Sequence, residues 1–252
     1  MKEQEPIRPI EEYRAAFADV ASRVGFEIDH SALESSLAYT SLLLEWNQVM
    51  NLTALTSPED VAVRHFLDSW ILLPLIEELF PNRKGLRLID VGTGAGFPGL
   101  PLKILRPDIK LVLLDSLQKR VNFLKQAAVA AGADDVECIH GRAEEAGRRR
   151  GYRDSFEIAA ARAVASMPEL CEYCLPFVKP GGYFIAMKGD SADEVNQARK
   201  AIHLLSGKLE EIKEFTLPGT DMKRSLIVIR KTGSTPQAYP RKAGKPHASP
   251  LL

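Results

Sequence analysis

Residues 88–99 have the sequence LIDVGTGAGFPG, which joins an apolar run to a glycine-rich turn. The run predicts a buried strand that carries Asp90 near its end, and the glycines then let the backbone turn sharply before a helix begins. Gly92, Gly94 and Gly96 follow the spacing G-x-G-x-G, whereas dinucleotide-binding proteins use G-x-G-x-x-G. The stretch therefore favours a turn that approaches a ligand closely, and a purely structural turn is the alternative.

Short apolar runs alternate with helical stretches over the rest of the chain. The segments between the runs are long enough for crossover helices, which predicts an α/β fold with a mostly parallel sheet between helices. In such folds ligands bind beyond the carboxyl ends of the strands. The last two runs suit an antiparallel pair at the sheet edge. The predicted strands cover residues 86–91, 110–115, 136–140, 156–161 and 183–188, and the antiparallel pair covers 209–215 and 226–231.

The first third of the chain predicts helices and no strand. Apolar side chains recur at helical spacing over residues 10–24, and Gly25 is placed to end this helix. Asp29 or Ser31 can cap a second helix, and Ser57 precedes a proline at the start of a third. We therefore expect a helical region over residues 1–84 that packs on a main domain over 85–232, followed by a basic, extended Pro- and Gly-rich tail over 233–252.

The composition is that of a soluble globular chain with a sizeable core. Hydrophobic residues make up 45% and charged residues 26% of the 252 residues. No apolar run approaches the roughly 20 residues that a membrane-spanning helix needs. The acidic, proline-containing N-terminus does not resemble a signal peptide, and three cysteines form no disulfide framework. We therefore expect a cytoplasmic protein with free thiols and no membrane association.

Basic residues gather in two segments, although 33 basic and 33 acidic residues give no net charge. Residues 222–252 contain seven Lys or Arg and no Asp or Glu, and a second cluster comprises Arg148, Arg149, Arg150 and Arg153. Such segments can neutralise phosphates. On charge alone, a solvated face with a disordered tail explains them equally well.

Two further side chains follow predicted strands at the same sheet edge. Asp115 closes the second strand 19 residues beyond Gly96, where doubly wound folds bind ribose hydroxyls. A strand-end Asp that caps the next helix is the alternative. Arg162 follows the fourth strand, where it would pair with a cofactor carboxylate or an RNA phosphate, unless it bridges to an acid such as Asp90. Together, the glycine turn and Asp115 resemble class I S-adenosylmethionine-dependent methyltransferases.

Six motifs, spread from about residue 30 to the end of the chain, resemble one family within that class. They are NLTA (51–54), RHFLDS (64–69), DVGTGAGFPG (90–99), LDS (114–116), ARA (161–163) and YPRKAGKP (239–246). The set resembles the ribosomal RNA small subunit methyltransferase G family, also called glucose-inhibited division protein B. This resemblance implies methyl transfer from S-adenosylmethionine to N7 of a guanine in bacterial 16S rRNA, alone or within a small-subunit ribosomal particle.

The resemblance also implies roles for individual residues. The S-adenosylmethionine site would be lined by Gly92, Gly94, Gly96, Phe97, Asp115, Ala143, Glu144 and Arg162. Candidate RNA contacts are Arg64, His65, Lys188, Lys223, Arg224, Arg241, Lys242 and Lys245. His65 and Asp68 lie three residues apart on one predicted helix. They would either face the cofactor cleft or hydrogen-bond each other and tie the helical region to the sheet.

The implied chemistry agrees with the motifs that are missing. Guanine N7 carries a lone pair and no proton, so methyl transfer needs alignment and charge stabilisation rather than a general base. The Asn-Pro-Pro-aromatic turn associated with exocyclic amines is missing, and Cys138, Cys171 and Cys174 occupy no nucleophile motif. The single C-x-x-C has no further zinc ligands at comparable spacing, so we expect no metal.

Two other functional classes stay open. A nicotinamide-dependent oxidoreductase would share the fold and the acid after the second strand, but it should show G-x-G-x-x-G and a proton-relay group. A non-catalytic RNA-binding protein on a decayed methyltransferase scaffold would keep the basic segments and lose cofactor affinity. The intact glycine turn argues against the second class.

Overall fold

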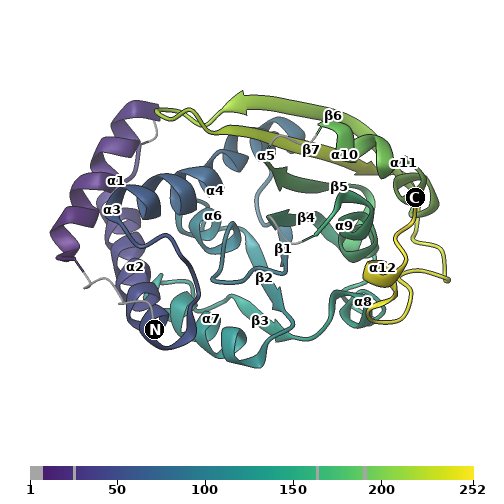
Figure 1. Ribbon diagram of the computed structural model, residues 1–252, viewed down its shortest axis with the longest axis horizontal. Coiled ribbons are helices and arrows are strands. Elements are labelled where there is room, and N and C mark those ends of the chain that lie inside the picture. Colours follow the sequence, from purple (N-terminus) through teal and green to yellow (C-terminus); the bar gives the residue numbers. More distant parts are fainter. Residues whose placement is uncertain (1–7, 25–26, 163–164, 190–191) are drawn as a thin grey trace.

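A seven-stranded sheet forms the centre of the computed structural model (Figure 1). The strand order is β3-β2-β1-β4-β5-β7-β6, and β7 runs antiparallel to both of its neighbours. The predicted α/β fold with a mostly parallel sheet is therefore confirmed. The structure describes residues 8–24, 27–162, 165–189 and 192–252. Gly25, the predicted end of the first helix, and Ala163 of the ARA motif lie outside these residues.

Helices and strands follow one another as predicted. The strands are β1 (Arg87–Val91), β2 (Lys110–Asp115), β3 (Glu137–His140), β4 (Phe156–Arg162), β5 (Val178–Lys188), β6 (Gly207–Thr216) and β7 (Lys223–Lys231). The helices before the sheet are α1 (Ile10–Val24), α2 (His30–Met50), α3 (Pro58–Asp60), the π-helix η1 (Val61–Leu67), α4 (Asp68–Trp70) and α5 (Leu72–Leu79). The later ones are α6 (Gly99–Leu105), α7 (Gln118–Ala130), α8 (Ala143–Ala146), α9 (Met167–Cys174), the 3-10 helix η2 (Leu175–Phe177), α10 (Ala192–Gln197), α11 (Arg199–Leu204) and α12 (Lys245–Ala248). None of the described helices is both long and apolar enough to cross a membrane.

The strand order reverses direction at β1. Ile89 of β1 lies opposite Val112 of β2 on one side and opposite Ala159 of β4 on the other, and both pairings are parallel. β2 and β3 extend the sheet in one direction, and β4 and β5 extend it in the other. Such a reversal opens a crevice beyond the carboxyl ends of the two central strands, where doubly wound sheets bind ligands. The glycine turn leaves β1 at this crevice.

Both faces of the sheet are buried. Leu88 of β1 packs into a hydrophobic cluster with residues of α1, α2, α6 and α7, whereas the next residue, Ile89, packs into a second cluster with residues of α9 and α11. Successive strand residues point to opposite faces, so a strand covered on both sides needs an unbroken apolar sequence. This explains why the parallel strands appear in the sequence as short apolar runs.

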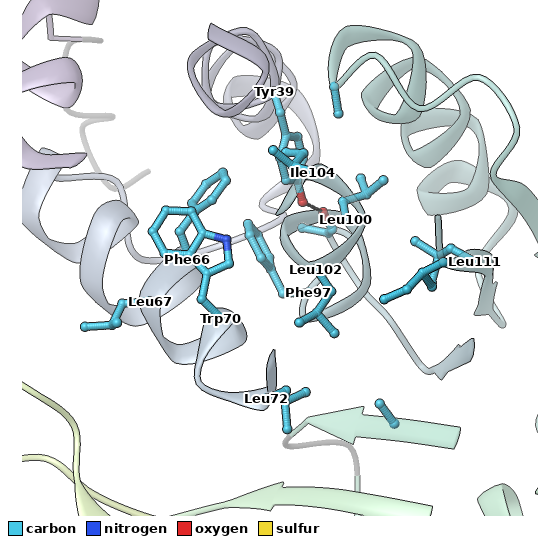
Figure 2. Close-up of a cluster of buried hydrophobic side chains, with 14 of the residues drawn as sticks. Tyr39, Phe66, Leu67, Trp70, Leu72, Phe97, Leu100, Leu102, Ile104 and Leu111 are labelled. Carbon is cyan, nitrogen blue, oxygen red and sulfur yellow. Dashed lines mark hydrogen bonds between the residues drawn. The ribbon is translucent and has the colours of Figure 1, made fainter. Parts of the chain in front are cut away.

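The N-terminal helices are joined to the glycine turn by buried aromatic side chains (Figure 2). Phe97 of the turn packs edge-on against Phe66, with ring centroids 5.7 Å apart, and Phe66 in turn contacts Trp70. Tyr39 of α2 donates a hydrogen bond to the carbonyl oxygen of Ala95. The helical region therefore shapes the turn directly. The division of the chain at residues 84 and 232 stays a prediction.

The helix starts follow the capping signals in the sequence. Asp29, rather than Ser31, caps α2, because its carboxylate accepts a hydrogen bond from the Ala32 N–H. Ser57 caps α3 in the same way. The chain then continues as a π-helix, which the sequence analysis did not predict and which carries Arg64 and His65. Short π-helical turns are frequent at functional sites.

The C-terminal tail differs from the extended segment that the sequence predicts. It folds against the main domain beside α8 and α9 and contains the short helix α12 (yellow in Figure 1). Pro246 is buried, and Tyr239 and Leu251 pack against the cluster that holds α9. Prolines and glycines supply no periodic apolar pattern, so this docking left no signal that the sequence analysis could use.

Candidate active site

Three glycines shape the turn after β1. Gly92, Gly94 and Gly96 have φ angles of 70°, 61° and 100°, a region that residues with a Cβ rarely adopt. The Gly92 N–H donates to the carbonyl oxygen of Leu114 at 2.8 Å, and the Gly94 N–H donates to Oδ2 of Asp115 at 3.0 Å. The turn is therefore fastened to the carboxyl end of β2.

Asp90 holds the two ends of the turn together. This fully buried carboxylate accepts hydrogen bonds through Oδ2 from the Thr93 hydroxyl at 2.6 Å and from the Gly99 N–H at 2.8 Å. Burial raises the pKa of Asp90 to about 6. Because Thr93 begins the turn and Gly99 begins α6, the carboxylate keeps the turn compact.

Gly96 and Gly94 give a matched pair of substitutions. A Cβ at Gly96 would lie 2.7 Å from the Tyr39 hydroxyl and 2.8 Å from Cδ1 of Leu100, whereas one at Gly94 meets nothing within 4 Å. We expect Gly94→Ala to cost about 1 kcal/mol through its positive φ. Gly96→Ala should lose a further ~1–3 kcal/mol through overpacking. Urea unfolding measures both variants, and equal losses would contradict the close approach of Tyr39.

Asp115 joins three segments at the carboxyl edge of the sheet. Its side chain is 3% exposed, with Oδ2 bound to the Gly94 N–H and Oδ1 accepting the Leu117 N–H at 2.9 Å. Arg120 lies 3.6 Å from the same carboxylate. A carboxylate oxygen accepts two hydrogen bonds, so each oxygen keeps capacity for a ligand hydroxyl. The predicted contact with a ribose diol stays a prediction, and the helix-capping alternative describes the Leu117 contact.

A cavity of about 510 Å³, here called the strand-end cavity, opens beyond β1, β2 and β3. Gly92, Ala143 and Glu144, which the sequence predicts at the cofactor, lie in its wall. Glu144 is 4% exposed and accepts the Gly244 N–H through Oε1 at 2.8 Å. The C-terminal tail also lines the cavity, through Ala243, Gly244 and His247, a contribution that the sequence pattern did not predict.

A second cavity, of about 360 Å³ and here called the arginine cavity, opens between η1 and the ends of β4, β5 and β7. It brings together five residues that the sequence predicts at the cofactor or the RNA. They are Arg64, His65, Arg162, Lys188 and Arg224. Asp68 also lines it. The structure therefore places Arg162 with the predicted RNA contacts and outside the strand-end cavity.

Asp68 is the centre of an ion-pair network in the arginine cavity. Its Oδ2 accepts a hydrogen bond from Arg162 at 3.2 Å, and its Oδ1 accepts one from Nε of Arg224 at 2.7 Å. Arg162 also lies over the Phe97 ring, 5.1 Å from its centroid. Asp68 thus ties the helical region to β4 and β7. Arg162 is bridged by Asp68 rather than by Asp90, the acid that the sequence suggested.

His65 is held as a neutral ring. It is 7% exposed, stacks on Phe97 with centroids 4.5 Å apart, and has Nε2 2.9 Å from the Thr53 hydroxyl. Burial and then the charge of Arg162 lower the pKa of His65 to about 3. His65 therefore pairs with Thr53, and Asp68, the partner considered from the sequence, binds the two arginines instead.

The low pKa of His65 predicts an acid-sensitive stability. Below about pH 6.5 the unfolded chain protonates this ring while the folded chain resists until about pH 3, so stability falls as the pH falls through this window. The raised pKa of Asp90 increases stability as the pH falls from about 6 to 4. This contribution is the same in the wild type and in a variant at His65, so it cancels in their comparison. In His65→Gln the free energy of unfolding should fall less steeply, by up to about 1.4 kcal/mol per pH unit. Identical slopes in urea titrations from pH 7 to 4.5 would contradict the buried neutral ring.

Four predicted RNA contacts lie elsewhere. Lys223 lines a cavity of about 280 Å³ at the paired ends of β6 and β7, next to Arg224. Arg241 forms an ion pair with the fully buried Glu172, at 2.6 Å between Nη2 and Oε2. Lys242 and Lys245 are exposed on the tail. Among the described residues no group of three or more His, Cys, Asp or Glu side chains is placed to hold a metal ion.

Comparison with known proteins settles the family. A family profile described as rRNA small subunit methyltransferase G matches residues 32–227. The chain belongs to this family. It is 50% identical to Ribosomal RNA small subunit methyltransferase G of Acetivibrio thermocellus over 94% of this chain and 96% of that protein. It is 49% identical to the protein of the same name from Alkaliphilus metalliredigens, over 95% and 99% of the two chains.

Solved structures agree with the fold of this methyltransferase G family member. An O-methyltransferase from Bacillus cereus, in complex with SAH, superposes with a TM-score of 0.54 at 16% identity, over 88% of this chain and 100% of that one. A geranyl diphosphate C-methyltransferase from Streptomyces coelicolor gives 0.54 at 12% identity, over 77% and 98%. At such identities the likeness supports the class I methyltransferase fold alone.

Proposed function

We propose that this protein transfers the methyl group of S-adenosylmethionine to N7 of a guanine in 16S rRNA. The observation that carries the proposal is the pair of cavities at the carboxyl edge of the sheet, one beside the glycine turn and one lined by basic side chains, in a member of the rRNA small subunit methyltransferase G family. Such a reaction would take place in the cytoplasm, on the RNA or on a small-subunit particle.

The strand-end cavity suits S-adenosylmethionine in size and chemistry. Its volume of about 510 Å³ lies within the ~300–1,000 Å³ range of small-molecule sites. Gly92 lets the backbone approach the ligand, and Glu144 supplies a carboxylate oxygen for the adenine amine. Asp115 lies between the lining residues Leu114 and Ser116, from where it would supply carboxylate oxygens for the ribose hydroxyls. Val91 and Leu114 provide apolar wall. Bound there, S-adenosylmethionine supplies an electrophilic sulfonium methyl group.

The arginine cavity suits a guanine and its phosphates. Arg64, Arg162 and Arg224 offer guanidinium groups, which bind phosphate oxygens in bidentate fashion. Among the described residues that line this cavity, Asp68 is the acidic one. Asp68 is paired with Arg162 and Arg224 and so holds these two guanidinium groups in place at the cavity.

The side chains present argue against other methyl acceptors. A pyrimidine C5 acceptor requires a thiolate nucleophile, yet burial raises the pKa of Cys138 to about 11 and that of Cys174 well above its ordinary value. Neither thiol lines the two cavities. Because N7 carries no proton, the buried neutral His65 need not act as a base.

The decisive experiment maps methylated guanines in rRNA by mass spectrometry. Cells with the gene should carry one 7-methylguanine in 16S rRNA that cells without it lack, and the purified protein should restore it with S-adenosylmethionine. Unchanged methylation would refute the proposal. Titration with S-adenosylhomocysteine and with NAD separates a methyltransferase from an oxidoreductase, and preferential binding of NAD would overturn the cofactor assignment.

The exposed lysines of the tail give a further prediction. Replacing both Lys242 and Lys245 with Ala should lower the affinity for a 16S rRNA fragment and reduce the slope of log affinity against log salt by up to about two. S-adenosylhomocysteine binding should be retained, since neither lysine lines the strand-end cavity. A salt slope equal to that of the wild type would show that these lysines do not contact phosphate.

A further inference from the structure

Two arginines of the segment after α8 donate hydrogen bonds to the backbone of the C-terminal tail. Arg148 donates to the carbonyl oxygens of Gln237, Ala238 and Pro240, the last at 2.8 Å. Arg153 donates to those of Thr235 at 2.8 Å, Pro236 at 3.1 Å and Tyr239 at 2.8 Å. Two side chains thus engage six consecutive carbonyl groups of residues 235–240.

Two fully buried charged side chains, Lys231 and Glu172, hold the tail before and after residues 235–240. Before this stretch, the fully buried ammonium group of Lys231 donates to the Thr235 hydroxyl at 2.5 Å and to Asp154 at 3.1 Å. After it, Arg241 donates to the buried Glu172 of α9 through its backbone N–H at 2.7 Å and through its guanidinium group. The tail is therefore anchored along its length by specific polar contacts.

The anchored tail ends at the strand-end cavity. Gly244, at a φ of 80°, directs its N–H to Oε1 of Glu144, and Ala243 and His247 complete that wall. His247 is steadied by Glu169, 3.0 Å from its Nδ1. The hydrogen bond from Gly244 fixes the orientation of Glu144 and leaves Oε2 as the acceptor for a ligand.

We propose that the C-terminal tail is a built part of the S-adenosylmethionine site, in which Ala243, Gly244 and His247 wall the adenine end and Gly244 orients Glu144. Arg148, Arg153 and Arg241 act as positioning residues through the tail. This inference rests on the proposed function. It assigns the arginine segment, for which the sequence offered no role beyond phosphate binding, to cofactor affinity, and it assigns Arg241 to anchoring the tail.

Calorimetric titration of the full-length protein with S-adenosylhomocysteine and with adenosine tests the inference. In Arg148→Met/Arg153→Met, affinity for both ligands should fall by roughly tenfold or more, because the carboxylate is no longer oriented. The neighbouring exposed Arg150→Met is the matched control and should bind like the wild type. Loss of affinity for S-adenosylhomocysteine but not for adenosine would overturn the assignment to the adenine end.

A second pair of variants tests the tail without changing Arg148 or Arg153. Gly244→Ala strains a φ of 80° beside the cavity, and Gly181→Ala strains a φ of 82° at the far end of β5, and neither added Cβ meets an atom within 4 Å. We expect Gly244→Ala to weaken both ligands several-fold and Gly181→Ala to leave them unchanged.

Hydrogen exchange supplies a readout besides affinity. Saturating S-adenosylhomocysteine should slow exchange of the amides of residues 239–248 in the wild type and protect them less in Arg148→Met/Arg153→Met. If Arg148→Met/Arg153→Met binds both ligands like the wild type, and ligand binding does not change amide exchange in the tail, the role of the tail is overturned. Failure of the wild type to bind S-adenosylhomocysteine at all would instead refute the proposed function, so the two failures are distinguishable.

Discussion

Asp115→Ala is expected to weaken S-adenosylhomocysteine binding by about 100-fold or more. The variant loses the acceptor for the Gly94 and Leu117 N–H groups, and with it the bond between the glycine turn and β2. Hydrogen bonds to a charged group contribute about 1.5–3 kcal/mol each, and about 1.4 kcal/mol corresponds to a tenfold change in affinity. Calorimetric titration measures the loss directly.

RNA binding provides the contrast for this prediction. Asp115 lies between Leu114 and Ser116, which line the strand-end cavity, and it does not line the arginine cavity, so affinity for a 16S rRNA fragment should change little. Asp115→Asn keeps one acceptor oxygen and should lose less affinity for the cofactor product than Asp115→Ala. The exposed Asp134→Ala is the control for a change of charge alone. Equal loss of cofactor and RNA affinity in Asp115→Ala would argue against its assigned role.

Asp68→Ala should be the most destabilising single substitution in the arginine cavity. The side chain of Asp68 is 6% exposed and those of Arg162 and Arg224 are 16% and 20% exposed, so removing the carboxylate leaves two largely buried cations without their partner. Breaking a buried pair from one side costs about 3–5 kcal/mol. The Tm should fall by roughly 6–20 °C, since each kcal/mol shifts it by about 2–4 °C in a chain of this size.

An exposed ion pair supplies the control for Asp68. Glu12→Ala removes the Arg8–Glu12 pair, whose side chains are 54% and 48% exposed, and should leave the Tm nearly unchanged. Asp68 lines the arginine cavity and does not line the strand-end cavity. At a temperature where Asp68→Ala remains folded, methyl transfer to RNA should therefore fall by a larger factor than S-adenosylhomocysteine affinity. A variant as stable and active as the wild type would contradict both roles.

Much of the fold follows from local patterns. The parallel strands are apolar because both faces of the sheet are covered, and the turn after β1 is glycine-rich because its φ angles are positive. The glycine turn and Asp115 were predicted at one edge of the sheet because the carboxyl ends of neighbouring parallel strands lie together. Six short motifs in the sequence predicted the family, and the comparisons confirmed it.

The amino-acid sequence alone determined the α/β class, the helix start at Ser57 and the position of the glycine turn, because the patterns that indicate them lie within short stretches of chain. Tertiary structure alone decided the rest. Arg224 meets Asp68 across 156 positions, and Arg148 meets Pro240 across 92. An arginine that binds a buried carboxylate or a backbone carbonyl has the same local sequence as one that binds phosphate. Only the folding of the chain selects its partner, since that choice depends on which groups are buried beside it.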